Sequence, residues 1–213
     1  MPTRAPNPRR RLFAAALLGI LWLLLLPACS THYVVDAQFP APLVPALPVV
    51  AHLHLSDEFS GYVFTEQRKD RRKISLSLGA AQVALFRSVT DQLSSADKSA
   101  PHLHLHPQIV DLQYAMPRET RAEIYEVWLK YRVQVTADPP EPDAEPELIA
   151  DWLLTGYGKA PSAFLQSPQA GLNAAATMAL RDTGAQLSIG LRRQPPIQTW
   201  LRQQELRSRR GAP

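Results

Sequence analysis

The chain has 213 residues, of which 46% are hydrophobic and 20% charged, enough apolar material for one well-packed domain. Its formal charge is +4 at pH 7, but four of its arginines lie in the first 28 residues. Without them, 19 Lys and Arg (23 minus 4) balance 19 Asp and Glu. The remainder of the chain is neutral, so we expect no nucleic-acid partner.

The N-terminus, residues 1–28, has the pattern of a secretory signal peptide. Basic residues precede the unbroken apolar run AAALLGILWLLLLPA, which ends at Ala28. A charged segment followed by an apolar run of this length is typical of an export signal and is short for a membrane-spanning helix. We therefore expect residues 1–28 to be removed.

The single cysteine, Cys29, directly follows this run in the sequence LPAC. This motif resembles the lipobox of bacterial lipoproteins, in which the cysteine is acylated with chains such as palmitate and becomes the mature N-terminus. Several acyl chains hold a protein on a membrane effectively permanently. Ser30 follows the cysteine, and by resemblance to lipoprotein sorting this favours the outer membrane, facing the periplasm, over the inner membrane. The alternative is an ordinary export signal with an incidental cysteine.

The mature chain divides into three parts in our interpretation. Residues 29–48 carry the lipid and form a proline-rich extended tether. Residues 49–202 form a single α+β periplasmic domain, and residues 203–213 form a basic flexible tail. This tail could contact anionic lipid, although charged termini are most often only solvated.

The first half of the domain begins with a strand at residues 49–55, where apolar residues alternate with His52 and His54. A polar hairpin or loop follows, and then a helix at residues 79–93, whose apolar residues recur at steps of three and four. Residues 102–116 form a second extended segment, interrupted or edged by Pro107, since proline cannot donate to a strand ladder.

The second half contains the clearest strand, in which residues 125–135 place an apolar side chain at every odd position. A proline-rich acidic loop, residues 138–147, connects it to a partner strand that ends near Pro161. Ser167 and Pro168 then predict the start of a helix that ends near Gly190. The order of elements predicts an α+β two-layer domain with two helices packed on one face of a mainly antiparallel sheet.

Five of the six histidines lie in the stretches HLH and HLHLH. Alternation places the side chains of the second stretch on one face, and a neighbouring first strand would add two more. Three neutral imidazoles would make an acceptable zinc site. The alternative is that the leucines face the core and the histidines simply face water, and we favour it because nothing in the sequence brings the two strands together. The metal candidates are His52, His54, His102, His104 and His106.

The sequence contains few signals of a catalytic or nucleotide-binding site. The chain contains no GxSxG, SxxK, phosphate-binding loop or GxGxxG pattern. We therefore expect no catalytic residue and no cofactor. Trp128, Tyr157 and Lys159 are candidates for a partner-binding surface, with a simple strand-ending turn as the alternative for the GYGKAP stretch.

The stretches YEVWLKYRVQV, DWLLTGYGKAP and ALRDTGAQL, with Trp200-Leu201, resemble a family of uncharacterised proteobacterial envelope lipoproteins over about residues 100–202. The resemblance implies a location and a shape but no activity. More loosely, the layout is similar to small lipoproteins that serve outer-membrane assembly, transport or secretion machines.

These features predict a lipid-anchored, non-enzymatic adaptor or accessory factor, bound to the membrane through its lipid and to a protein of an envelope complex. Two alternatives stay open. One is a periplasmic metal-binding protein that uses the histidine strands, and the other is an envelope hydrolase.

Overall fold

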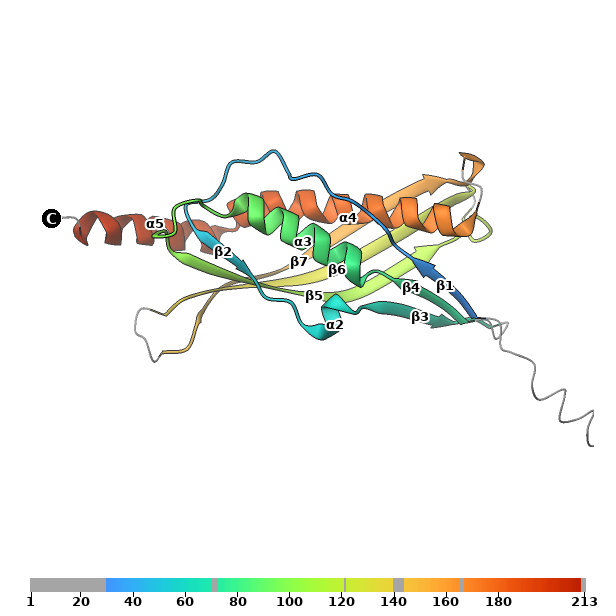
Figure 1. Ribbon diagram of the computed structural model, residues 1–213, viewed down its shortest axis with the longest axis horizontal. Helices are drawn as coiled ribbons and strands as arrows, with labels where there is room; N and C mark the ends of the chain where they lie inside the picture. The colour runs from blue at the N-terminus through green and yellow to red at the C-terminus, as the bar shows by residue number, and fades with distance from the viewer. Residues whose placement is uncertain (1–29, 70–72, 121, 140–143, 165–166, 212–213) are drawn as a thin grey trace, which may run out of the picture.

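The computed structural model describes residues 30–69, 73–120, 122–139, 144–164 and 167–211 (Figure 1). Within them lie strands β1 (Ser30–Val34), β2 (Val50–Leu53), β3 (Val63–Gln67), β4 (Lys73–Ser77), β5 (His102–Ala115), β6 (Ile124–Ala137) and β7 (Glu147–Pro161). The helices are α2 (Asp57–Ser60), α3 (Gly79–Leu93), α4 (Pro168–Arg193) and α5 (Pro195–Gly211), with a 3₁₀ turn η1 (Ser162–Phe164).

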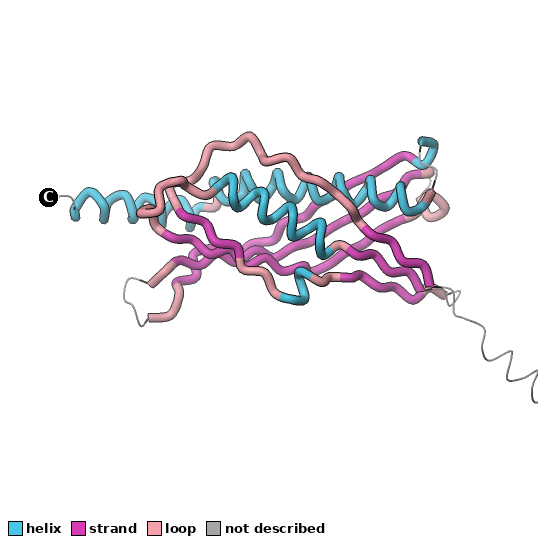
Figure 2. Tube along the Cα trace, viewed as in Figure 1, coloured by secondary structure: helices cyan, strands magenta, loops and turns pink. Residues whose placement is uncertain are grey.

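The strands form two sheets. The larger has the order β2-β5-β6-β7, and the smaller has the order β1-β4-β3. Within them β2 pairs with β5 and β1 with β4 in parallel, while the other pairs are antiparallel. The predicted α+β two-layer fold is confirmed, with α3 and α4 on one side of the strands (Figure 2). The strands are divided between two sheets, whereas the sequence predicted one.

The long strand β6 shows why the sequence folds in two layers. Its odd-numbered apolar side chains are buried from Tyr125 to Val135, as the alternation predicted. They face α3 and α4, whose own small and apolar residues complete the core. The even-numbered side chains of β6 lie on the opposite face of the sheet.

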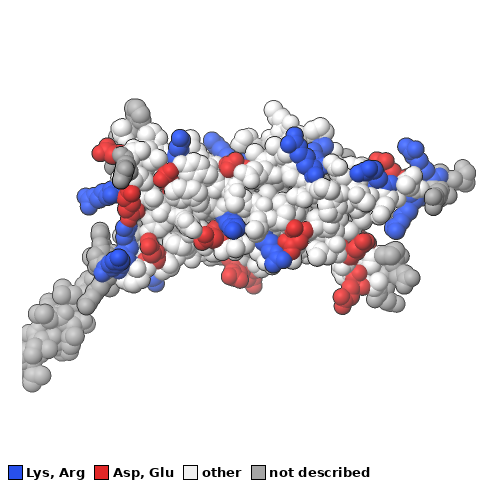
Figure 3. Space-filling model, turned by 180° about the vertical axis from the view of Figure 1, so that it is seen from behind, with Lys and Arg blue, Asp and Glu red and all other residues white. Residues whose placement is uncertain are grey.

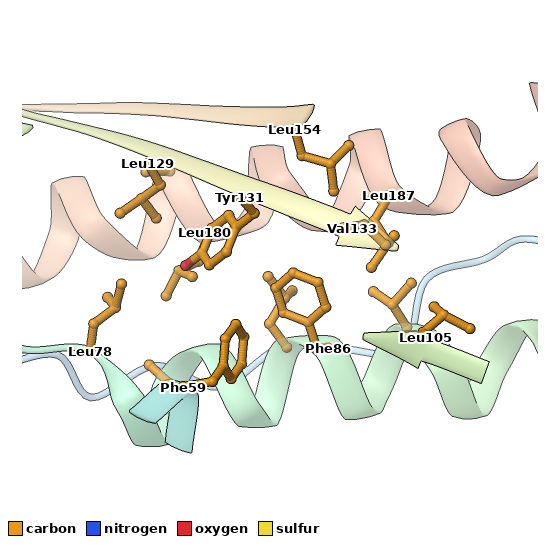
Figure 4. Packing of buried hydrophobic residues seen from close by; sticks show 14 of the residues in the cluster. Phe59, Leu78, Phe86, Leu105, Leu129, Tyr131, Val133, Leu154, Leu180 and Leu187 are labelled. Atoms are coloured by element: carbon orange, nitrogen blue, oxygen red, sulfur yellow. The ribbon is translucent and has the colours of Figure 1, made fainter. Parts of the chain in front are cut away.

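The centre of this core is aromatic. Tyr131 from β6 contacts Phe86 of α3 at a ring-centroid distance of 5.3 Å, and Phe86 contacts Phe59 of α2 at 5.4 Å (Figure 4). The buried Tyr131 hydroxyl donates a hydrogen bond to Gln82 Oε1 at 3.0 Å. Gln82 in turn donates to the carbonyl of Phe59, so the polar atoms of this cluster are satisfied.

Helix α4 begins where the sequence predicted, because the Ser167 side chain accepts a hydrogen bond from the amide of Ala170. It continues past Gly190 to Arg193. The helix lies unusually close to β7, since a Cβ at Gly156 or Gly158 would collide with carbonyl oxygens of α4.

The proline-rich segment expected to be a tether lies along the domain. Its first residues form β1 beside β4, and the chain then runs along the helical layer to β2 (Figure 2). The amide of Asp36 donates to Asn173 of α4 at 2.8 Å, and the amide of Leu47 donates to the carbonyl of Leu93 at 2.8 Å. Val35 and Leu47 are buried, so these residues contribute to the core.

The C-terminal residues 203–213, expected to be a flexible tail, are helical as far as Gly211. They continue helix α5, whose first turns are held by the buried residues Ile197 and Trp200, whereas none of residues 203–209 is buried. The helix projects from the body at the end of the molecule opposite to Ser30 (Figure 1). Its basic side chains are therefore far from the position where the signal peptide would join the domain.

Strand β5 is continuous through Pro107, so the predicted interruption is wrong, whereas the predicted edge position is confirmed. Its partner β2 ends opposite Leu105, whereas β6 pairs with β5 on both sides of the proline. Pro107 therefore lies where β5 has lost one of its two neighbours, which is a position that tolerates a missing donor.

Candidate functional site on the open face of the four-stranded sheet

The candidate site is the face of the larger sheet that the helices leave uncovered. It carries the even-numbered side chains of β6 and, beside them, odd-numbered side chains of β7. Seen from behind, acidic and basic side chains are interspersed along the body, with the arginines of α5 at one end (Figure 3). No broad surface of one charge appears on the view drawn.

A β-bulge at Val110 divides this face into two regions. The pairing of β5 with β6 shifts between Ile109 and Asp111, and Val110 is 53% exposed. Before the bulge the even-numbered residues of β5 face outward; after it the odd-numbered residues do, because the extra residue reverses the alternation. We call the two regions the histidine end (His52, His54, His102, His104 and His106) and the aromatic end (Trp128 and Tyr157 with their neighbours).

At the aromatic end, Trp128 of β6 lies directly opposite Tyr157 of β7. Their ring centroids are 5.4 Å apart with an interplanar angle of 34°, and the two residues are 39% and 40% exposed. The Tyr157 hydroxyl donates to Glu126 Oε1 at 2.6 Å, and this hydrogen bond is the main cause that raises the pKa of Tyr157. Lys159 lies opposite Glu126 in the next row, so the structure brings all three predicted surface residues together.

The aromatic pair borders a hollow of about 450 Å³. Its walls are equally polar and apolar and come from β5, β6, β7 and α4. The lining residues include Asp111, Gln113, Lys130, Thr155, Asp182 and Gln186. The volume lies within the range of small-molecule pockets, but the walls are less apolar than such pockets usually are.

The adjoining edge of the sheet is closed at this point. Asp182 of α4 accepts a hydrogen bond from the amide of Tyr157 at 3.0 Å, and Gln186 donates to the carbonyl of Thr155 at 2.6 Å. These two side chains satisfy backbone groups that an edge strand normally presents to a partner. A partner would therefore meet the face of the aromatic end, since the neighbouring edge of β7 is already bonded.

At the histidine end, the parallel pairing of β2 with β5 places His52 beside His104. The rings of these two residues stack with centroids 5.0 Å apart, and those of His54 and His106 stack at 4.8 Å. His52 Nε2 is 3.2 Å from His102 Nδ1, and His54 Nε2 is 2.9 Å from His104 Nδ1. The structure thus brings all five predicted metal candidates to one surface, where His52 contacts His102 and His104, and His54 contacts His104 and His106.

Two residues that the sequence analysis did not assign complete this end. Asp138, just after β6, accepts a hydrogen bond from His104 Nε2 at 2.8 Å, and Thr136 lies 3.2 Å from His106 Nε2. Burial, followed by the charges of His104 and His102, lowers the pKa of His52 below its ordinary value. Burial also lowers the pKa of His106. The strand register that places Asp138 here has no signal in the sequence.

The described residues contain no group of three or more His, Cys, Asp or Glu side chains that could hold a metal ion. The three-imidazole zinc site considered for these strands is therefore not preformed within them, because alternate histidines on one strand stack with the neighbouring strand instead. The lipidation candidate Cys29 lies outside the described residues. Within the described residues, no helix is both long and apolar enough to cross a membrane.

No protein-family model matches the chain, and no curated protein matches it. Among solved structures, the chain is similar to the crystal structure of a DUF330 protein from Xanthomonas campestris, with a TM-score of 0.46 and 10% sequence identity. The likeness covers 74% of this chain and 92% of that one. A likeness at this level carries no activity to this chain.

Proposed function

We propose that the protein is a lipid-anchored, non-enzymatic accessory factor of the bacterial envelope, which docks a partner protein through its aromatic end. The observation that carries this proposal is the Trp128–Tyr157 pair, which is exposed on the one face of the large sheet that the helices leave open. Tryptophan and tyrosine beside a polar rim are the residues that most often dominate protein interfaces.

The anchor in this proposal is Cys29, acylated after removal of residues 1–28, with the protein on the outer membrane and facing the periplasm. Ser30, the next residue, begins β1 at one end of the long axis of the domain (Figure 1). An anchor at that point would leave the open sheet face and α5 directed along or away from the membrane surface. Such an orientation suits contact with a neighbouring component of an envelope complex.

The experiment is affinity capture of the tagged, full-length protein from crosslinked and detergent-solubilised membranes. We expect Cys29→Ala to release the protein from the membrane and to abolish recovery of the complex. We expect Trp128→Ala to keep the protein on the membrane but to lose the partner, because the anchor and the docking face are separate.

The matched control is Leu153→Ala. Leu153 is an exposed apolar residue on the same face of β7, 53% exposed and outside the aromatic pair. This variant should retain the partner. Equal recovery of the same partner by the Trp128→Ala and Leu153→Ala variants would contradict a docking role for the aromatic end.

A further inference from the structure

We propose that His54 and His104 form a binding site for a divalent transition-metal ion such as Cu²⁺ or Zn²⁺, with Asp138 as the residue that positions His104. The site lies at the histidine end and does not depend on the docking role proposed for the aromatic end. It is a two-imidazole site, unlike the three-histidine site considered from the sequence.

The hydrogen bonds at His104 determine which of its nitrogens can bind a metal. Asp138 Oδ1 lies 2.8 Å from His104 Nε2, and an ionised carboxylate only accepts hydrogen bonds. Nε2 must therefore carry the proton, which leaves the lone pair of a neutral His104 on Nδ1. That nitrogen points at His54 Nε2. A carboxylate bound to the far nitrogen is the usual second-shell partner of a metal-binding histidine.

The distance between the two facing nitrogens is that of a hydrogen bond, and it also falls within the separation of two ligands that share one ion. His54 Nε2 and His104 Nδ1 are 2.9 Å apart. Two imidazole ligands at about 2.0–2.1 Å from an ion, with an angle of about 90–109° between them, are separated by roughly 2.9–3.4 Å. In the metal-free protein the Nε2–H group of His54 donates a hydrogen bond to Nδ1 of His104. When an ion binds, that proton moves to His54 Nδ1 by a change of tautomer, and a rotation of the two rings turns both lone pairs from each other toward the ion.

The second pair, His52 and His102, lacks this arrangement. Its nitrogens are 3.2 Å apart, but Asp138 Oδ2 is 3.6 Å from the same His102 nitrogen that faces His52. The carboxylate thus lies near the nitrogen that would bind the ion, and not near Nε2 of His102, where it would fix the tautomer. This difference assigns the ion to His54 and His104.

An ion at this site would keep open coordination positions. The described residues supply no third ligand to it, so water or a donor from a bound partner would complete the coordination. The site is accessible, since His54 is exposed and the His104 side chain retains 21% of its surface. Imidazole ligands suit Cu²⁺ and Zn²⁺ among the common divalent metals, and Cu²⁺ is bound most tightly.

The test is a titration of the full-length protein in detergent with Cu²⁺, after purification on a tag without histidine and treatment with a chelator. Calorimetry measures the affinity and the number of ions bound, and electron paramagnetic resonance reports the nitrogen ligands. We expect one ion per chain with two coordinated nitrogens. Absence of binding, or a spectrum without nitrogen ligands, would overturn the proposal.

Variants then locate the ion. His54→Gln should weaken binding at least about 10-fold, and Asp138→Asn should weaken it by about 10-fold or more, as second-shell changes do. His32→Gln is the matched control, because His32 lies on β1 in the other sheet and bonds to Ser77. If His54→Gln failed to fold, as judged by circular dichroism, Asp138→Asn would carry the test. An affinity unchanged by Asp138→Asn, or lowered equally by His32→Gln, would refute the site. A third variant, His52→Gln, tests the other pair, and a loss of affinity confined to that variant would also refute the site.

Discussion

The two ends of the open sheet face are built from the same strand β5, yet different neighbours support them. The aromatic end lies on three long antiparallel strands and is backed by α4, which reaches around the edge of β7 to bond its backbone. The histidine end depends on β2, a strand of four residues paired in parallel with the start of β5. Its side chains are ordered mainly by contacts with each other.

One extra residue gives the single strand β5 two surfaces of different chemistry. At the histidine end the outward residues of β5 are even-numbered and rich in imidazole; beyond Val110 they are odd-numbered and include Asp111 and Gln113. The bulge makes both patterns face the same side of the sheet while the leucines of both halves remain in the core. Three changes to the sequence test how each end of the sheet face is supported.

The largest effect should follow deletion of Val110. Without the bulge, the two halves of β5 share one alternation, so either Leu112 or Leu103 and Leu105 must turn outward. We expect loss of more than about 4 kcal/mol in the free energy of unfolding, or no soluble protein, as measured by denaturant unfolding. Val110→Ser keeps the extra residue and should stay within about 1 kcal/mol of the parent. Similar stabilities for the two variants would show that the bulge does not couple the ends.

Gly158→Val should destabilise the fold through the packing of the aromatic end on α4. Its side chain would collide with the carbonyl of Ala175, a backbone atom that can move only with α4. We expect a loss of about 3 kcal/mol or more in the free energy of unfolding, measured in the same way. The control is Lys159→Ala, the next residue on β7 with an exposed side chain, which should change stability by about 0.5 kcal/mol or less. A Gly158→Val protein as stable as this control would mean that α4 does not hold β7 closely.

The smallest effect concerns Arg132 and Asp151, which lie between the two ends. Arg132 donates to both carboxylate oxygens of Asp151, and this holds the pKa of Asp151 below its ordinary value of 3.8. Because the folded pKa is the lower one, the pair stabilises the fold above pH 3.8, and the contribution disappears as the pH falls through the folded pKa. In Arg132→Gln, the titration midpoint of the Asp151 carboxyl should rise, as followed by ¹³C NMR. An unchanged midpoint would remove Arg132 as the cause.

Much of the local structure could be predicted from the sequence. The alternation in β6 indicated its buried face, and Ser167-Pro168 indicated the start of α4. The surface candidate Trp128 was found because the alternation distinguishes inward from outward positions, whereas Tyr157 and Lys159 were found from the glycines of the GYGKAP stretch. These signals are local, since strand alternation, capping and helical periodicity depend on residues close in the chain.

Other features depend on contacts between distant segments, and these the sequence did not predict. The sequence indicated a flexible tether because its prolines show no apolar period, yet buried residues such as Val35 and Leu47 attach it to the domain. Burial of a single side chain depends on what lies opposite it, which a local pattern does not contain.

By itself, the sequence determined the alternation of β6, the start of α4 and the positions of the histidines along two strands. Only the tertiary structure decided that β2 lies parallel to β5 in the register that pairs His54 with His104, and that Asp138 meets them from the end of β6. The physical reason is that strand order, register and bulges are set by the fit of the whole core, in which a shift of one residue changes every side-chain contact.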